Sequence, residues 1–108
     1  MISLHQAKKD FSWLGEVLAV HSIGPYDLVE YWHDPSKFHL QDEPRDLRRV
    51  KNWGTYVNDK KTSISYGSMD EALAGCIAYR AEGPNCQAAH FFIRGIGLGD
   101  HREYEKED

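Results

Sequence analysis

Apolar residues recur at helical spacing at the beginning of the chain, where they fall at Leu4, Ala7, Phe11 and Leu14. The stretch SLHQ has the composition of a capping box, in which Ser3 accepts a hydrogen bond from the third helical amide and Gln6 reaches back. We therefore expect a helix over residues 4–12. Residues 13–22 are ambiguous, because the helical spacing continues through them while EVLAVHSI is also typical of a strand.

Three later segments alternate polar and apolar residues as strands do. YDLVEYWH, residues 26–33, is rich in β-branched and aromatic side chains. Residues 53–58 and 61–66 flank the pair Asn58-Asp59, and both of these residue types tolerate positive φ. The two segments are therefore predicted to form a hairpin around a tight turn.

The last third of the chain predicts two helices. SMDE, residues 68–71, is a second capping box, and an apolar stripe follows it at Met69, Ala72, Leu73, Cys76 and Ile77. Gly83 is placed to end this helix, and Asn85 is placed to cap another that carries Ala89, Phe92, Ile93 and Ile96. The predicted fold class is α+β: an N-terminal helix, a three-stranded antiparallel sheet, and two C-terminal helices packed on one face of that sheet.

The charge of the chain is concentrated at its C-terminal end. The formal net charge of the 108 residues is −4, and the final stretch DHREYEKED accounts for −3 of it, which leaves −1 for residues 1–99. We expect a single α+β domain over residues 1–99 and an acidic, disordered tail over residues 100–108.

Composition also predicts where the protein works. No run of residues approaches the roughly 18 apolar positions that a membrane span needs, and the first residues are too polar for a signal peptide. The two cysteines, Cys76 and Cys86, are interpreted as reduced, since a chain of this length needs no bridge to fold. Together these features predict a soluble cytoplasmic protein with no membrane partner.

The motifs of common enzymes and metal sites are missing. The sequence contains neither H-E-x-x-H nor C-x-x-C, and neither G-x-S-x-G nor a phosphate-binding glycine loop before a helix. His33, Asp34, His39 and Asp42 are metal-donor types that lie close in sequence, and Cys86 and His90 are one helical turn apart. None of these spacings is specific, so we expect no enzyme activity, no cofactor and no metal.

The stretch PRDLRRVKNWGTYV, residues 44–57, concentrates basic and aromatic side chains. Its cations would neutralise phosphates while Trp53 or Tyr56 stacks on a base, as in a nucleic-acid-binding surface. Alternatively, Pro44 begins a short helix with acids near its first turn and bases near its last, which matches the helix dipole.

Two resemblances bear on nucleic-acid binding. The predicted order of helix, three strands and helix resembles that of double-stranded RNA-binding domains, which hold phosphates with lysines at the start of the last helix. This chain has Asp70 and Glu71 there, and acids repel phosphate. Residues 53–79 are similar to DNA-binding sheets of the AP2 kind, with a strand tryptophan, a hairpin and a helix that begins with paired acids. The arginines that such sheets project are replaced by Thr55, Val57, Thr62 and Ser63.

The remaining signal is a group of aromatic residues in the strand and loop region. Helices on one face of a three-stranded sheet leave the other face open, so some of these aromatic residues should be exposed, and exposed Trp and Tyr beside Arg are typical of protein-binding hot spots. We predict a small protein-binding module, monomeric or homodimeric, in the style of the accessory or inhibitor proteins of bacteria and phages, which occludes a partner surface. Nucleic-acid binding through residues 45–56 is the alternative. The predicted partner-binding residues are Tyr31, Trp32, Arg45, Arg48, Arg49, Lys51, Trp53 and Tyr56.

Overall fold

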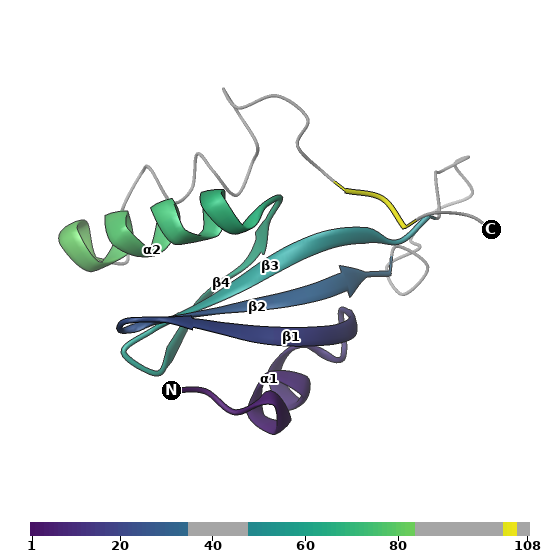
Figure 1. The fold of residues 1–108 in the computed structure, drawn as a ribbon, viewed down its shortest axis with the longest axis horizontal. Coiled ribbons are helices and arrows are strands. Elements are labelled where there is room, and N and C mark those ends of the chain that lie inside the picture. The colour runs from purple at the N-terminus through teal and green to yellow at the C-terminus, as the bar shows by residue number, and fades with distance from the viewer. Residues whose placement is uncertain (35–47, 84–102, 106–108) are drawn as a thin grey trace.

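The computed structural model describes residues 1–34, 48–83 and 103–105. Its elements are α1 (Leu4–Phe11), β1 (Gly15–Ile23), β2 (Tyr26–His33), β3 (Val50–Val57), β4 (Lys60–Tyr66) and α2 (Met69–Glu82). The strands form one antiparallel sheet in the order β1-β2-β3-β4, so each strand pairs with its neighbours in the chain (Figure 1). The α+β class, the N-terminal helix and the antiparallel sheet are confirmed. No helix in the described part of the chain is long and apolar enough to cross a membrane.

The ambiguous residues 13–22 belong mostly to a strand, so the sheet has four strands where the sequence predicted three. β1 pairs with β2 from Gly15 opposite His33 to Ile23 opposite Tyr26, with a bulge between Val17 and Ala19. Because the bulge inserts one extra residue, Val17 and Val20 both pack toward α1 although they are three positions apart. A bulged strand thus reproduces the spacing of a helix, which explains the ambiguity.

β3 begins at Val50, earlier than predicted, so the short helix expected from Pro44 does not extend over residues 48–51. Pairing with β2 runs without interruption from Val50 opposite His33 to Val57 opposite Tyr26. A ladder of this length outweighs one or two helical turns, which are marginal by themselves. The predicted turn at Asn58 and Asp59 is confirmed, with φ angles of 51° and 66°. Residues 35–47 lie outside the described residues.

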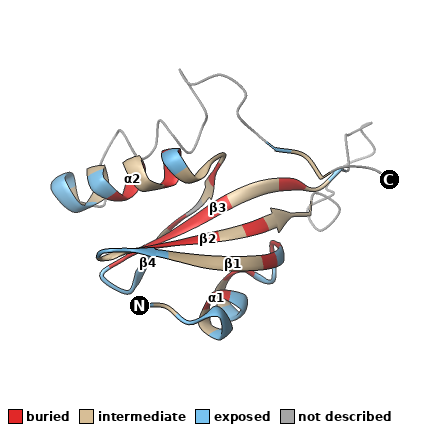
Figure 2. Ribbon diagram, viewed as in Figure 1, coloured by how far each residue is buried: buried red, intermediate tan, exposed pale blue. Residues whose placement is uncertain are grey.

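The two described helices, α1 and α2, lie on opposite faces of the sheet (Figure 2), which corrects the expectation that one face of the sheet is left open. The α1 face buries Ala7, Phe11, Leu14, Val17, Val29, Tyr31 and Tyr56. The α2 face buries Leu28, Trp53, Val57, Tyr66, Ala72 and Cys76. Strands whose successive residues are both apolar, such as Leu28 and Val29, present a surface on each side and need a cover on each. The helix predicted to follow Asn85 lies outside the described residues.

A capping box has two reciprocal hydrogen bonds, and each predicted box forms only the one accepted by the serine hydroxyl. The hydroxyls of Ser3 and Ser68 accept from the amides of Gln6 and Glu71, at 3.1 and 3.2 Å. The return bonds go elsewhere: Gln6 donates to Asp10, and the Glu71 carboxylate accepts from the amide of Gly67. α2 ends as predicted at Gly83, whose positive φ of 83° suits glycine.

Candidate partner-binding surface

One end of the α2 face carries the charged and aromatic residues that the sequence singled out. Alternation along β2 and β3 places Trp32 and Lys51 on the same face as Leu28 and Trp53, and the ladder sets Trp32 directly opposite Lys51. Arg49 precedes β3 on the same side, where its guanidinium lies over Trp32. We refer to Trp32, Arg49 and Lys51, together with Arg48 at the adjoining edge of the sheet, as the basic–aromatic surface; Arg48 contacts Tyr104, the partner of Val50, so alternation directs it to the other side of the sheet. In the part of the chain that is described, residues 103–105 run along its edge (Figure 1).

Trp32 lies close to two cations. The Lys51 Nζ is 4.8 Å from the centre of its ring, and the Arg49 guanidinium carbon is 5.9 Å away. Cations are attracted to the negative face of an indole at such distances. Trp32 is half-buried at the end of β2, and the two contacts favour one side of the sheet for its ring.

Lys51 is held by carboxylates on two sides. Its Nζ lies 2.7 Å from Glu30 and 3.6 Å from Glu103, and His21 approaches the other oxygen of Glu30 at 3.1 Å. Partial burial opposes the charge of Lys51, but the contacts with Glu30 and Glu103 together outweigh it and raise the pKa of Lys51. Burial likewise opposes ionisation of Glu30, yet hydrogen bonds from Lys51 and His21 hold the pKa of Glu30 below its ordinary value. The pair is therefore ionised at neutral pH.

Arg49 is clamped between Glu105 and Glu16. Its Nε donates to the Glu105 carboxylate at 2.6 Å, and a second guanidinium nitrogen donates to the other oxygen of the same carboxylate. The third nitrogen reaches Glu16 at 3.0 Å. These hydrogen bonds raise the pKa of Arg49, and the one from Arg49 lowers the pKa of Glu105. A two-pronged contact of this kind is the geometry in which arginine recognises a carboxylate most specifically.

Residues 103–105 extend the sheet at the beginning of β3. β4 ends at Tyr66 opposite Trp53, so it does not pair with the residues of β3 before Trp53. There the Lys51 amide donates to the Glu103 carbonyl at 2.7 Å, and the Glu105 amide donates to the Arg49 carbonyl at 2.8 Å. The Arg48 guanidinium lies 4.5 Å from the centre of the Tyr104 ring. Three residues of the predicted tail 100–108 are thus paired, and its other residues lie outside the described part.

The structure brings three of the predicted partner-binding residues onto one face, Trp32, Arg49 and Lys51, and places Arg48 at the adjoining edge on the other side of the sheet. Trp53 shares their face but is buried, with His21 packed at 5.4 Å from its ring. Tyr31 and Tyr56 lie on the opposite face, in the core beneath α1, with 1% and 2% of their surface exposed. Strand alternation explains why the predicted residues fall on two faces of the sheet, because neighbours such as Tyr31 and Trp32 must point to opposite faces. Arg45 lies outside the described residues.

Sequence reasoning missed the acidic partners of these cations, which are Glu16, Glu30, Glu103 and Glu105. Once β2 and β3 are known to pair, the position of Glu30 diagonal to Lys51 follows from the ladder. For Glu103 and Glu105, the sequence offered a weaker signal, namely that the C-terminal tail and the basic stretch carry opposite charges. Charge complementarity by itself does not predict which residues meet.

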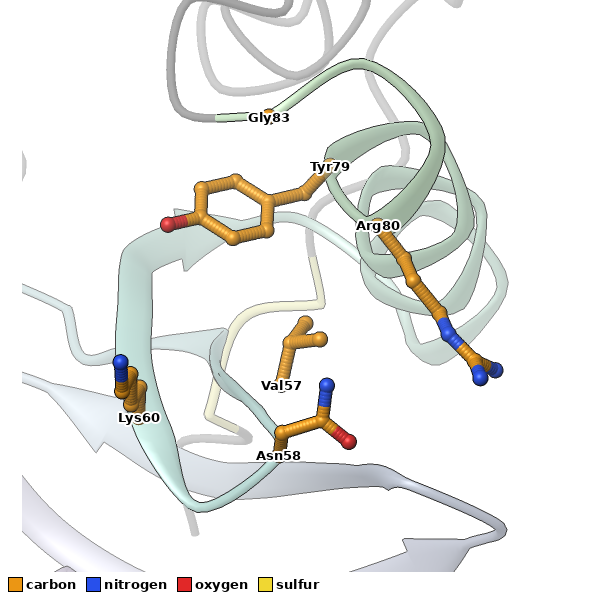
Figure 3. Close-up of a pocket in the computed structure, with 6 residues that line it drawn as sticks. All are labelled: Val57, Asn58, Lys60, Tyr79, Arg80 and Gly83. Carbon is orange, nitrogen blue, oxygen red and sulfur yellow. The ribbon is translucent and has the colours of Figure 1, made fainter.

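A separate hollow of about 300 Å³ lies between the β3–β4 turn and the end of α2. Figure 3 shows its lining residues, which are Val57, Asn58, Lys60, Tyr79, Arg80 and Gly83. The Arg80 side chain points away from Lys60, so the two cations do not converge on one point (Figure 3). The last carbonyls of α2, the negative end of the helix dipole, are also near. The hollow therefore lacks the geometry of an anion site.

The described residues also bear on nucleophilic and metal chemistry. Burial raises the pKa of Cys76 to about 11, and a protonated buried thiol is a poor nucleophile. In the described ranges, no three His, Cys, Asp or Glu side chains are grouped to hold a metal ion. Cys86 and His90 lie outside those ranges.

The fold and surface define a small α+β protein in which a four-stranded antiparallel meander carries a helix on each face and a charged, aromatic edge. Comparisons with models of protein families, with curated proteins and with solved structures find no match.

Proposed function

We propose that this chain is a non-enzymatic protein-binding module that uses the basic–aromatic surface to occlude a surface of its partner. The observation that carries the proposal is Trp32, half-buried and in contact with Arg49 and Lys51 at one end of the sheet. Trp and Arg are the residue types most enriched in binding hot spots, and side chains held in place beforehand lose little freedom on binding. Trp32, Arg48 and Arg49 would be the anchors, with buried Trp53 supporting them.

The ion pairs favour a protein partner over nucleic acid. Arg49 and Lys51 each contact two carboxylates, and a phosphate backbone would have to displace those acids while being repelled by them. A protein segment can replace Glu103 and Glu105 with its own carboxylates and, unlike a phosphate backbone, with main-chain hydrogen bonds to Arg49 and Lys51. Nucleic-acid binding remains the rival, and it predicts an affinity that falls steeply with salt and is lost in the variant Arg48→Glu, Arg49→Glu.

The test is affinity capture of the tagged full chain from a host lysate, with and without nuclease. We expect one dominant protein partner that survives nuclease. Trp32→Ala should weaken the complex by about tenfold or more, as loss of a hot-spot side chain does. Trp13→Ala is the matched control, because Trp13 is 53% exposed but lies beside Lys61 and α1, away from the basic–aromatic surface.

Equal losses in the two tryptophan variants would argue against this surface. Captured material that consists of nucleic acid, or that disappears on nuclease treatment, would overturn the proposed function in favour of its rival.

A further inference from the structure

We infer that the basic–aromatic surface recognises an extended acidic segment of another protein, which pairs with the beginning of β3 as an added strand. This inference rests on the proposed protein-binding function and names the chemistry of the partner. Residues 103–105 occupy the same edge within the chain and show which features fit it.

At this point the edge of β3 is not covered by β4. Beyond the end of β4, the Arg49 carbonyl and the Lys51 amide point outward, and Glu105 and Glu103 satisfy them at 2.8 and 2.7 Å. An isolated antiparallel bridge joins Val50 to Tyr104 between the two bonds. Peptides commonly bind proteins by adding a strand to such an edge, since main-chain hydrogen bonds provide affinity whatever the side chains.

The side chains define an alternating pattern of acid, aromatic and acid. Glu103 approaches Lys51, and the Glu105 carboxylate forms a two-pronged contact with Arg49. The intervening Tyr104 ring lies beneath the Arg48 guanidinium. Successive residues of a strand point to opposite sides, so a segment with this alternation meets all three cations at once.

The contacts that hold residues 103–105 are weak enough for another segment to replace them. The side chains of Glu103 and Glu105 are 67% and 38% exposed, so water and salt screen their ion pairs. The described pairing spans three residues, and β4 covers β3 from Trp53 onward, so a partner strand would compete for the same short edge. The chain's own segment then acts as an intramolecular competitor, which any partner must displace.

The experiment titrates the isotope-labelled full chain with a synthetic peptide of residues 101–108 and follows amide resonances of Arg49 to Lys51 and the Trp32 indole. We expect saturable shifts confined to this region. In the chain variant Glu103→Gln, Glu105→Gln, the internal segment is held less firmly, so the peptide should bind about two- to fivefold more tightly.

Two altered peptides separate strand addition from general attraction. A peptide with Glu103→Gln and Glu105→Gln lacks the charges, and one with Glu105→Pro lacks the amide that donates to the Arg49 carbonyl. Both should bind more weakly than the parent. In the chain, Arg49→Gln should weaken binding. Lys8→Gln with Lys9→Gln should not, because these exposed lysines belong to α1 on the opposite face.

Absence of saturable shifts in both the parent and the Gln variant chain would overturn the inference, as would equal binding of the parent and neutral peptides. A captured partner that depends on Trp32 but is not displaced by the peptide would overturn the inference and leave the proposed function standing. If the peptide binds but capture of the partner is insensitive to Trp32→Ala, the proposed function would be overturned and the peptide result would not. A chain dimer that the peptide dissociates would identify a second copy as the occupant, contrary to the inference.

Discussion

Single residues decide how closely each helix approaches the sheet. Gly54 lies beneath the Phe11 ring, where a Cβ atom would overlap the ring itself. The ring packs at 5.5 Å from Tyr31 and 5.9 Å from Tyr56, centre to centre, so it has little room to move. On the other face, Gly75 of α2 meets the hydroxyl end of Tyr66 in the same way. Each helix thus rests on the sheet through a glycine and an aromatic ring.

We expect Gly54→Ala to lower the free energy of unfolding by about 1–3 kcal/mol, the usual cost of overfilling a packed core. Urea unfolding of the parent and variant would measure it. Phe11→Leu alone should also destabilise, but in the double variant the two losses should sum to less than their separate values, because the smaller side chain relieves the overlap. Strict additivity would mean that the two residues do not meet.

Among the elements, the β3–β4 hairpin is the one whose geometry local sequence dictates most directly. Asn58 and Asp59 both have positive φ, as the favoured two-residue hairpin turn requires. β1 is the contrary case, because its bulge makes a strand resemble a helix in spacing. Elements with a distinctive turn or cap were therefore predicted well, whereas β1 was decided by its partner β2.

At Asp59, we expect Asp59→Gly to be more stable than Asp59→Ala by about 1 kcal/mol, since alanine at this φ brings its Cβ against the backbone. Both variants remove the carboxylate that contacts the Met1 amine, so their difference reports the backbone alone. Thermal or urea unfolding of the pair gives the value. An alanine variant as stable as the glycine variant would contradict the turn geometry.

At the scale of the whole molecule, charges link segments that are distant in the chain. Arg49 joins Glu16 of β1 to Glu105, and Lys51 joins Glu30 of β2 to Glu103. The acidic end of the sequence thereby offsets its basic stretch, which explains how a surface with three cations occurs in a chain of net charge −4. The same pairs make the edge of the sheet sensitive to pH and salt.

Stability should fall in acid for this reason. The pKa values of Glu30 and Glu105 lie below the ordinary value of about 4.5, so their stabilising effect is fully present above that pH and is lost as the pH falls through the lowered values. Urea unfolding between pH 3 and 7 should show a constant free energy near neutrality and a decline below about pH 4.5. Glu30→Gln should flatten that decline; an unchanged slope would mean that Glu30 is not paired in the folded state.

The candidate surface could be predicted only in part, for physical reasons. The cations and Trp32 were found because their residue types are distinctive, but alternation assigns a face only to residues inside a strand, and it does not say which face a helix will bury. With β3 starting at Val50, Lys51 and Trp53 fall on one face and Tyr56 on the other. The sequence predicted the start three residues later and could not separate core aromatic residues from surface ones.

What the sequence by itself determined is local: α1 and α2 with their serine caps, β2, and the turn at Asn58 and Asp59. Each of these depends on interactions between residues a few positions apart. Tertiary structure alone decided that residues 15–23 form a strand, that α1 and α2 lie on opposite faces, and that residues 103–105 pair with β3. Those outcomes depend on partners distant in the chain, whose hydrogen bonds and buried surface exist only once the sheet has formed.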